Sequence, residues 1–203
     1  MPRPRSLTPD RIADAALAVV DRSGLHGLSM RAVAAELGTG TMSLYRYVEG
    51  RQHLEDLIVE RTLGAIDVTV PAGMAWADRV RLLCERARTT VGARPDLVAL
   101  VLMRRHAVPA SRRWGEAVLA ALADGGLAGE ERAIALRTLM AYVLGAVQVE
   151  HFGPLAGPGT LALADDPATY PLLAEAATSA HPLPPAEEFA RGLDTLLRGL
   201  TRP

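Results

Sequence analysis

The side chains with the most distinctive chemistry lie close together, between Thr41 and Arg51. Leu44 and Val48 are four residues apart and would face inward on a short helix, so their neighbours would project outward. These neighbours supply hydroxyls, aromatic rings and a guanidinium, groups that donate hydrogen bonds to phosphates and to base edges. The predicted outward residues are Thr41, Met42, Ser43, Tyr45, Arg46 and Tyr47. Their pattern favours contact with a nucleic acid over an ordinary solvated helix face.

The segment Leu28–Arg51 predicts a helix-turn-helix that would present these side chains. Ser29 is a suitable N-cap for a first short helix, and Gly38 suits the left-handed position that ends it. A second short helix is expected over Thr41–Tyr47. In such a unit the second helix enters the major groove of B-DNA, so we expect this one to do the same.

A preceding helix completes an N-terminal three-helix unit, and a longer helix follows it. Thr8 is the predicted N-cap of a helix that Gly24 ends, and a longer helix is predicted from Arg51 to about Ile66. The sequence Val-Pro-Ala-Gly at residues 70–73 then breaks the helical pattern. We therefore predict one domain over residues 1–70, with its core at 8–66, and a second over 71–203.

The second domain is also predicted to be helical, so the expected fold class is all-α. Only 4% of the residues are aromatic, and alternating β-branched runs are scarce. Glycine and proline breakers separate the expected helices. These helices are Trp76–Arg94, Pro95–Arg105, Ala110–Asp124, Glu130–Phe152, Pro167–Ala180 and Ala186–Arg198.

Composition excludes several classes of protein. The 203 residues carry a net charge of −1, so any nucleic-acid surface must be local; all 22 basic residues are Arg. The single Cys84 excludes an intrachain disulfide and a cysteine-based zinc site. The longest apolar run, Met140–Val147, is far shorter than the roughly 20 residues of a membrane span. With no apolar stretch near the start, we expect a cytoplasmic protein without a signal peptide.

The segment resembles the DNA-binding domain of the tetracycline-repressor-like (TetR) family of bacterial transcription regulators. The matching residues are Leu28-Ser29-Met30-Arg31, Glu36-Leu37-Gly38, Ser43-Leu44-Tyr45-Arg46-Tyr47-Val48 and Gly50-Arg51, within residues 8–66. The second domain resembles the ligand-binding and dimerisation domain of the same family. That resemblance is carried by Arg94-Pro95-Asp96-Leu97, Leu144-Gly145-Ala146 and residues 189–194.

Side-chain chemistry and the resemblance together imply roles for the DNA-binding residues. Phosphate contacts are expected from the hydroxyls of Ser29 and Tyr45 and from Arg51, which stands where the family usually has lysine. Guanine contacts are expected from Arg31 and Arg46, and thymine-methyl contacts from Thr41 and Met42. Ser43 belongs to the same surface, and Tyr47 would contact a phosphate or a sugar. Arg3 and Arg5 form either a basic arm for the minor groove or a solubilising tail.

The second domain is expected to form a homodimer on a pseudo-palindromic double-stranded DNA operator. The predicted helix Glu130–Phe152 is apolar around nearly its whole circumference, which favours burial against both its own domain and a second subunit. The last helix adds an apolar stripe that would complete a four-helix seam. A central helix of a monomeric bundle is the alternative. The resemblance also implies a pocket for a small-molecule effector, with candidate lining residues Met103, His106, Trp114, Val118, Leu139, Tyr142, Val143 and His151.

The sequence therefore predicts a ligand-responsive transcriptional regulator, most simply a repressor that its effector releases from DNA. The alternatives are a small-molecule-modifying helical enzyme and a helical scaffold that does not bind DNA. Gly38-Thr39-Gly40 is only a fragment of a dinucleotide-binding motif and follows no predicted strand. We predict no catalytic residues, no metal ligands and no cofactor.

Overall fold

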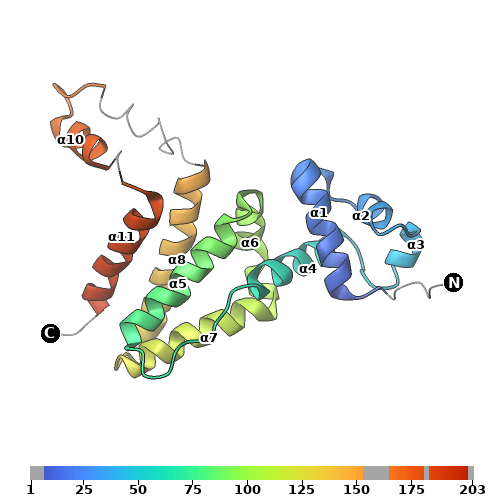
Figure 1. Ribbon diagram of the computed structural model, residues 1–203, viewed down its shortest axis with the longest axis horizontal. Coiled ribbons are helices and arrows are strands. Elements are labelled where there is room, and N and C mark those ends of the chain that lie inside the picture. Colours follow the sequence, from blue (N-terminus) through green and yellow to red (C-terminus); the bar gives the residue numbers. More distant parts are fainter. Residues whose placement is uncertain (1–6, 153–164, 181–182, 201–203) are drawn as a thin grey trace. The chain divides into compact units, whose positions relative to one another are not determined.

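The computed structural model describes residues 7–152, 165–180 and 183–200 (Figure 1). The described residues form helices and no strand, which confirms the all-α prediction. Contacts divide the chain into two compact units. The first unit contains residues 1–67 and 96–114, and the second contains residues 68–95 and 115–203.

The first unit is built around the helices α1 (Pro9–Gly27), α2 (Met30–Glu36), α3 (Thr41–Leu44) and α4 (Arg51–Gly64). Helix α1 packs against both α2 and α4. The buried apolar side chains of these helices include Ile12, Ala16 and Val19 of α1, Val33 of α2, and Leu54 and Ile58 of α4. Thr8 caps α1 as predicted, since its hydroxyl oxygen accepts a hydrogen bond from the Arg11 amide at 3.3 Å. Gly24 has a φ of 65° and interrupts α1 where the sequence predicts an end, before one further turn to Gly27.

A segment distant in sequence belongs to the same unit. It comprises the 3₁₀ turn η1 (Pro95–Leu97), α6 (Val98–Arg104), the 3₁₀ turn η2 (Arg105–Ala107) and the start of α7 (Pro109–Asp124). The sequence predicts one continuous helix over Pro95–Arg105, but the structure has an α-helix between two 3₁₀ turns.

Polar contacts attach this segment to α4. Both carboxylate oxygens of Asp56 accept hydrogen bonds from Arg104 at 2.8 Å. The Glu60 carboxylate accepts one from the Ala110 amide at 2.7 Å and pairs with Arg113 at 2.9 Å. Residues 96–114, which the sequence alone assigns to the second domain, therefore cluster with the first unit.

The second unit has α5 (Trp76–Gly92) in contact with α8 (Gly129–Phe152) and α11 (Pro185–Leu200). Phe189 of α11 lies at their junction: its ring stacks on Tyr142 at 5.1 Å between centroids, and the Arg88 guanidinium lies 5.3 Å from its centroid. Arg88 is nearly buried and pairs with Glu150 of α8 at 2.9 Å. The described part of the unit also includes the end of α7 and the helix α10 (Pro171–Ala180), which begins later than predicted because the preceding residues form a turn.

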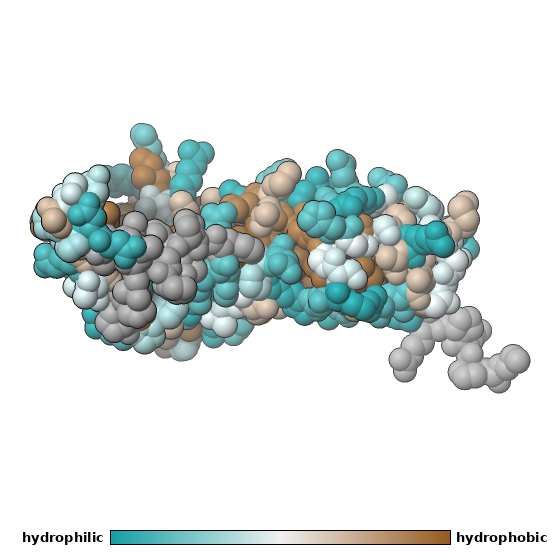
Figure 2. Space-filling model, turned by 90° about the horizontal axis from the view of Figure 1, so that it is seen from above, coloured by the Kyte–Doolittle hydropathy of each residue, from teal (hydrophilic) through white to brown (hydrophobic). Residues whose placement is uncertain are grey.

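Helix α8 is only partly buried within one chain. Leu139, Val143 and Val147 are buried, but Ile134 and Val149 are each 54% exposed. The surface in Figure 2 likewise shows separate brown hydrophobic areas among the teal hydrophilic side chains. By length and hydropathy alone, Gly129–His151 would qualify as a membrane span. One such helix does not indicate a membrane protein, because core helices of soluble proteins meet the same criteria.

Candidate nucleic-acid interface

Helix α2 begins at a side-chain cap, as predicted. The Ser29 hydroxyl oxygen accepts a hydrogen bond from the Ala32 amide at 3.1 Å. This bond uses the oxygen as an acceptor, so the hydroxyl proton remains available for donation. Ser29 is exposed, and its hydroxyl can donate to a phosphate while still capping α2.

The turn between α2 and α3 depends on Gly38. Its φ is 63°, a left-handed conformation that side chains with a Cβ rarely adopt. The Gly38 amide donates to the Ala35 carbonyl at 3.0 Å, and the Thr39 amide donates to the Ala34 carbonyl at 2.9 Å. This pair of bonds is the Schellman motif, which satisfies carbonyls at a helix end and reverses the chain sharply. The turn therefore directs residues 41–47 away from α2.

Two buried side chains anchor the second helix of the motif. Leu44 and Val48 are both 0% exposed, as the sequence predicts. The α-helix is shorter than predicted, because it ends at Leu44 and a hydrogen-bonded turn continues to Tyr47. A helix of four residues is unstable alone, so its position depends on these two anchors.

The residues around these anchors project outward, as predicted. Met42 is 78% exposed, and Tyr45 and Tyr47 are 49% and 45% exposed. Ser43 and Arg46 are also exposed, and Thr41 is half-buried at the start of α3. The motif thus presents a thioether, four hydroxyls and a guanidinium on one short stretch of the surface.

The two arginines that are predicted to contact guanines have no carboxylate partner among the described residues. Among the described residues, Arg31 and Arg46 are exposed and form no ion pair, whereas Arg22, Arg61 and Arg104 of the same unit each hold a carboxylate. A guanidinium without an intramolecular partner is free to form a bidentate contact with guanine. Arg3 and Arg5 lie outside the described residues.

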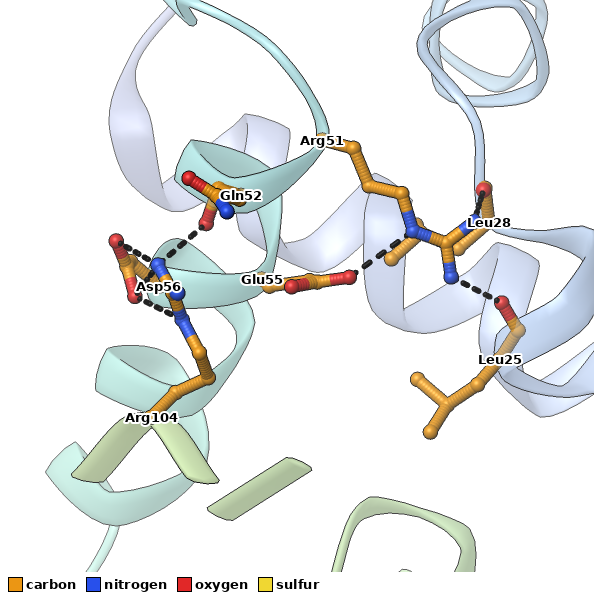
Figure 3. Close-up of polar contacts among 7 residues, drawn as sticks. All are labelled: Leu25, Leu28, Arg51, Gln52, Glu55, Asp56 and Arg104. Atoms are coloured by element: carbon orange, nitrogen blue, oxygen red, sulfur yellow. Dashed lines mark hydrogen bonds and ion pairs between the residues drawn. The ribbon is translucent and has the colours of Figure 1, made fainter. Parts of the chain in front are cut away.

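Arg51 behaves differently from the other predicted DNA contacts. Its guanidinium donates to the backbone carbonyls of Leu28 and Leu25, at 3.0 and 3.1 Å, and to the Glu55 carboxylate at 2.9 Å (Figure 3). The prediction of a phosphate contact did not include Glu55. The spacing of four residues between Arg51 and Glu55 on a helix was the signal available in the sequence.

Family models match both parts of the chain. The model described as bacterial regulatory proteins of the tetR family matches residues 12–54, and the model for the tetracyclin repressor-like C-terminal domain matches residues 70–202. The chain belongs to the TetR family. The residues that carry the sequence resemblance lie within the two matched regions.

The TetR-family relatives include proteins described as regulators and repressors. The transcriptional repressor DrrR1 of Streptomyces coeruleorubidus is 36% identical over 72% of this chain and 54% of its own length. A transcriptional regulator of Saccharopolyspora erythraea is 32% identical over 71% of this chain and 61% of its own length. This chain thus matches little more than half of these two relatives.

Solved structures extend the similarity to nearly the whole chain. Apo ActR from Streptomyces coelicolor superimposes with a TM-score of 0.83, at 30% identity, over 96% of this chain and 95% of ActR. ActR in complex with actinorhodin gives a TM-score of 0.81 at 31% identity, over 96% of this chain and 97% of that one.

The residues predicted to line an effector pocket of this TetR-family chain are divided between its two units. Met103, His106 and Trp114 belong to the first unit, and Val118, Leu139, Tyr142, Val143 and His151 to the second. Met103 is 72% exposed and His106 is also exposed, whereas Val118 and Leu139 are 0% exposed.

Within the second unit, Tyr142 is already engaged. Its hydroxyl donates to the Phe189 carbonyl at 2.8 Å, and burial, followed by the nearby Glu188 carboxylate, raises the pKa of the phenol. A hollow of about 450 Å³ borders α10, between Pro167 and Ser179, and none of the eight predicted residues lines it.

Side chains that could bind a metal ion do not cluster in the described part of the chain. No group of three or more His, Cys, Asp or Glu side chains there is arranged to hold a metal ion. Burial raises the pKa of the Cys84 thiol to about 12, so this cysteine stays protonated and unreactive near neutral pH.

Proposed function

We propose that this chain is a ligand-responsive transcriptional regulator that binds a pseudo-palindromic DNA operator as a homodimer in the cytoplasm. One observation carries the proposal: the outward residues 41–47 stand on a sharply turned helix-turn-helix whose second helix is anchored by Leu44 and Val48. Such a helix is suited to the major groove, and its hydroxyls and guanidinium are suited to phosphates and base edges.

The proposed dimer is supported by the apolar side of α8 that its own chain leaves exposed. Ile134 and Val149 lie on this side, and exposed apolar side chains on a long helix commonly mark an interface between subunits. On the operator, the two α3 helices of the dimer, here called the reading helices, would lie about 34–36 Å apart in successive major grooves.

The repressor function and the effector are proposed from the relatives. DrrR1 is described as a repressor, and ActR has been solved with actinorhodin bound. We propose that a small aromatic molecule binds in the helical domain after residue 70, where the predicted residue His151 would orient it. Its binding would favour a dimer whose reading helices are wrongly spaced for the operator.

The salt dependence of DNA binding tests the proposed function. A duplex enriched from a random-sequence library by the wild-type protein serves as the operator, and a scrambled duplex serves as the non-specific competitor. A dimer with six to ten phosphate contacts should lose about 10³- to 10⁵-fold in affinity between 50 and 200 mM salt, with two chains bound to each duplex. A helical enzyme or scaffold would enrich no duplex and show no such slope.

The variants Arg31→Ala and Arg46→Ala should each relax the preference at one base pair of that duplex. A bidentate guanine contact discriminates between bases by about 1–3 kcal/mol, so the preference at that pair should fall roughly 5- to 150-fold. The control is Arg112→Ala, which removes an exposed guanidinium of the same unit outside the motif. If the binding preferences of both variants match those of the control, neither arginine reads a base.

Effector and operator should weaken each other by the same factor. This equality is required by thermodynamic linkage, and coupling of this kind is typically 5- to 150-fold. Calorimetric titration of actinorhodin, or of another compound that raises the melting temperature, is carried out with and without saturating operator. Identical affinities in the two titrations would rule out the proposed release mechanism.

A further inference from the structure

The guanidinium of Arg51 is bound on three sides within its own unit. Nε donates to Glu55 Oε1 at 2.9 Å, Nη1 to the Leu28 carbonyl at 3.0 Å, and Nη2 to the Leu25 carbonyl at 3.1 Å (Figure 3). Each nitrogen of the group therefore already has a partner. These partners lie on two sides of the unit, since Glu55 is on α4 and the two leucines are at the end of α1.

The two carbonyls lie at the C-terminal end of α1. Beyond Gly24 the chain completes one short turn, and Leu28 then adopts an extended conformation as the C-cap of α1. The Leu25 carbonyl accepts a hydrogen bond from the Leu28 amide at 3.3 Å and from Arg51 as a second donor. Carbonyls at a helix end lack part of their regular helical amides, so a side-chain donor stabilises them. Leu28 directly precedes Ser29, the N-cap of α2. The Arg51 bonds consequently fix where α2 begins relative to the first residue of α4.

Glu55 holds the guanidinium in this orientation. It lies one turn after Arg51 on α4, and its side chain is 18% exposed, against 53% for Arg51. The planar guanidinium of arginine has donors on three nitrogens, a fork that can donate to three separated acceptors. The ammonium of lysine has all its donors on one nitrogen. A lysine here would keep the positive charge, but it could not hold α1 and α4 together in the same way.

We infer that Arg51 is a positioning residue, which ties the start of α4 to the α1–α2 junction and so sets how the helix-turn-helix stands on α4, and that it is not a phosphate contact. The inference rests on the proposed DNA binding, because the orientation of the motif matters only if the motif docks on a duplex. The role of Arg51 is thus to stabilise the internal geometry of the unit, although its side chain is half-exposed beside the motif.

Arg51→Lys and Arg51→Met distinguish this positioning role, called the tie below, from a phosphate contact. We expect both variants to bind the enriched duplex about ten-fold more weakly than wild type, because both lose the fork. The slope of log affinity against log salt should stay unchanged in both, as should binding to the scrambled duplex. If Arg51→Lys binds like wild type and Arg51→Met flattens the slope by about 1.8, that is about 0.9 for each of the two chains on the duplex, Arg51 contacts a phosphate and the inference is wrong.

Glu55→Gln is an independent test, because the two possible roles of Arg51 predict opposite changes in operator binding. If Arg51 is a tie, the loss of the carboxylate loosens the fork and weakens operator binding. If Arg51 contacts phosphate, the same change frees the guanidinium and removes a negative charge, so binding strengthens. The control is Glu49→Gln, which removes an exposed acid two residues before Arg51 that has no contact with the fork.

Amide hydrogen exchange tests the tie without DNA and separates its failure from failure of the proposed function. In Arg51→Lys, exchange should accelerate at residues 25–33 and remain unchanged in α5, which belongs to the second unit. Thermal melting confirms that each variant is folded. If wild type enriches no duplex, the proposed function fails. Unchanged exchange at residues 25–33 would overturn the tie whether or not DNA binds.

Discussion

Leu44→Ala is expected to abolish sequence-specific DNA binding while the second unit stays folded. Leu44 is completely buried and is the central anchor of α3, a helix of only four residues. Truncating a buried leucine costs about 2–5 kcal/mol, and a short surface element has little stability of its own to offset this loss. The reading helix should therefore detach from the unit and lose the fixed geometry that base contacts require.

The measurement is a gel shift with the enriched duplex, together with a thermal melt and hydrogen exchange. Protection should be lost over residues 39–48 and retained in α5, α8 and α11. Met42→Ala is the matched control, because it also removes an apolar side chain from α3, but one that is 78% exposed. That variant should stay folded and lose preference only at a thymine position. Wild-type binding by Leu44→Ala would show that residues 41–47 are not the reading surface.

The sequence predicts those features of the motif that depend on neighbouring residues. Thr8, Ser29 and Gly38 occur where the structure has two side-chain caps and a left-handed helix end. Each signal requires only a donor, an acceptor or a missing Cβ within three or four residues. The alternation of Leu44 and Val48 with exposed neighbours is equally local, so the outward set is predicted correctly from spacing alone.

Features that depend on distant residues are not predicted. The partners of Arg51 include two backbone carbonyls, 23 and 26 residues away, and no residue type identifies a carbonyl that needs a donor. The sequence therefore predicts a phosphate contact for Arg51 without predicting these partners. The sequence likewise does not predict the contact of residues 96–114 with α4, where Arg104 binds Asp56 across 48 residues of sequence.

For α8, the sequence predicts more burial than the single chain provides. Its apolar circumference predicts burial on all sides, but the single chain covers Leu139 and Val143 and leaves Ile134 and Val149 exposed. The sequence pattern reports the total burial that a helix requires, without distinguishing its own chain from a partner. The difference between the pattern and the single chain is consequently itself an argument for the proposed dimer.

Gly192→Ala is expected to destabilise the second unit, because α11 lies close to Tyr142 of α8 at this glycine. A Cβ at residue 192 would clash with the Tyr142 hydroxyl oxygen and lie 2.9 Å from its Cζ. The tyrosine has little freedom to move away, since its hydroxyl donates to the Phe189 carbonyl at 2.8 Å and its ring stacks on Phe189. The added methyl must therefore break that hydrogen bond or push α11 away from α8.

Overpacking of this kind costs about 1–3 kcal/mol, which in a protein of this size corresponds to a fall of roughly 3–10 °C in the melting temperature. Gly199→Ala is the control on the same helix, where a Cβ meets nothing within 4 Å and alanine gains helix propensity. Adding Tyr142→Phe to Gly192→Ala should restore part of the loss, because it removes the nearest atom. Equal melting temperatures for Gly192→Ala and Gly199→Ala would show that the α8–α11 contact is loose. In that case it could not hold the rigid surface that the proposed dimer requires.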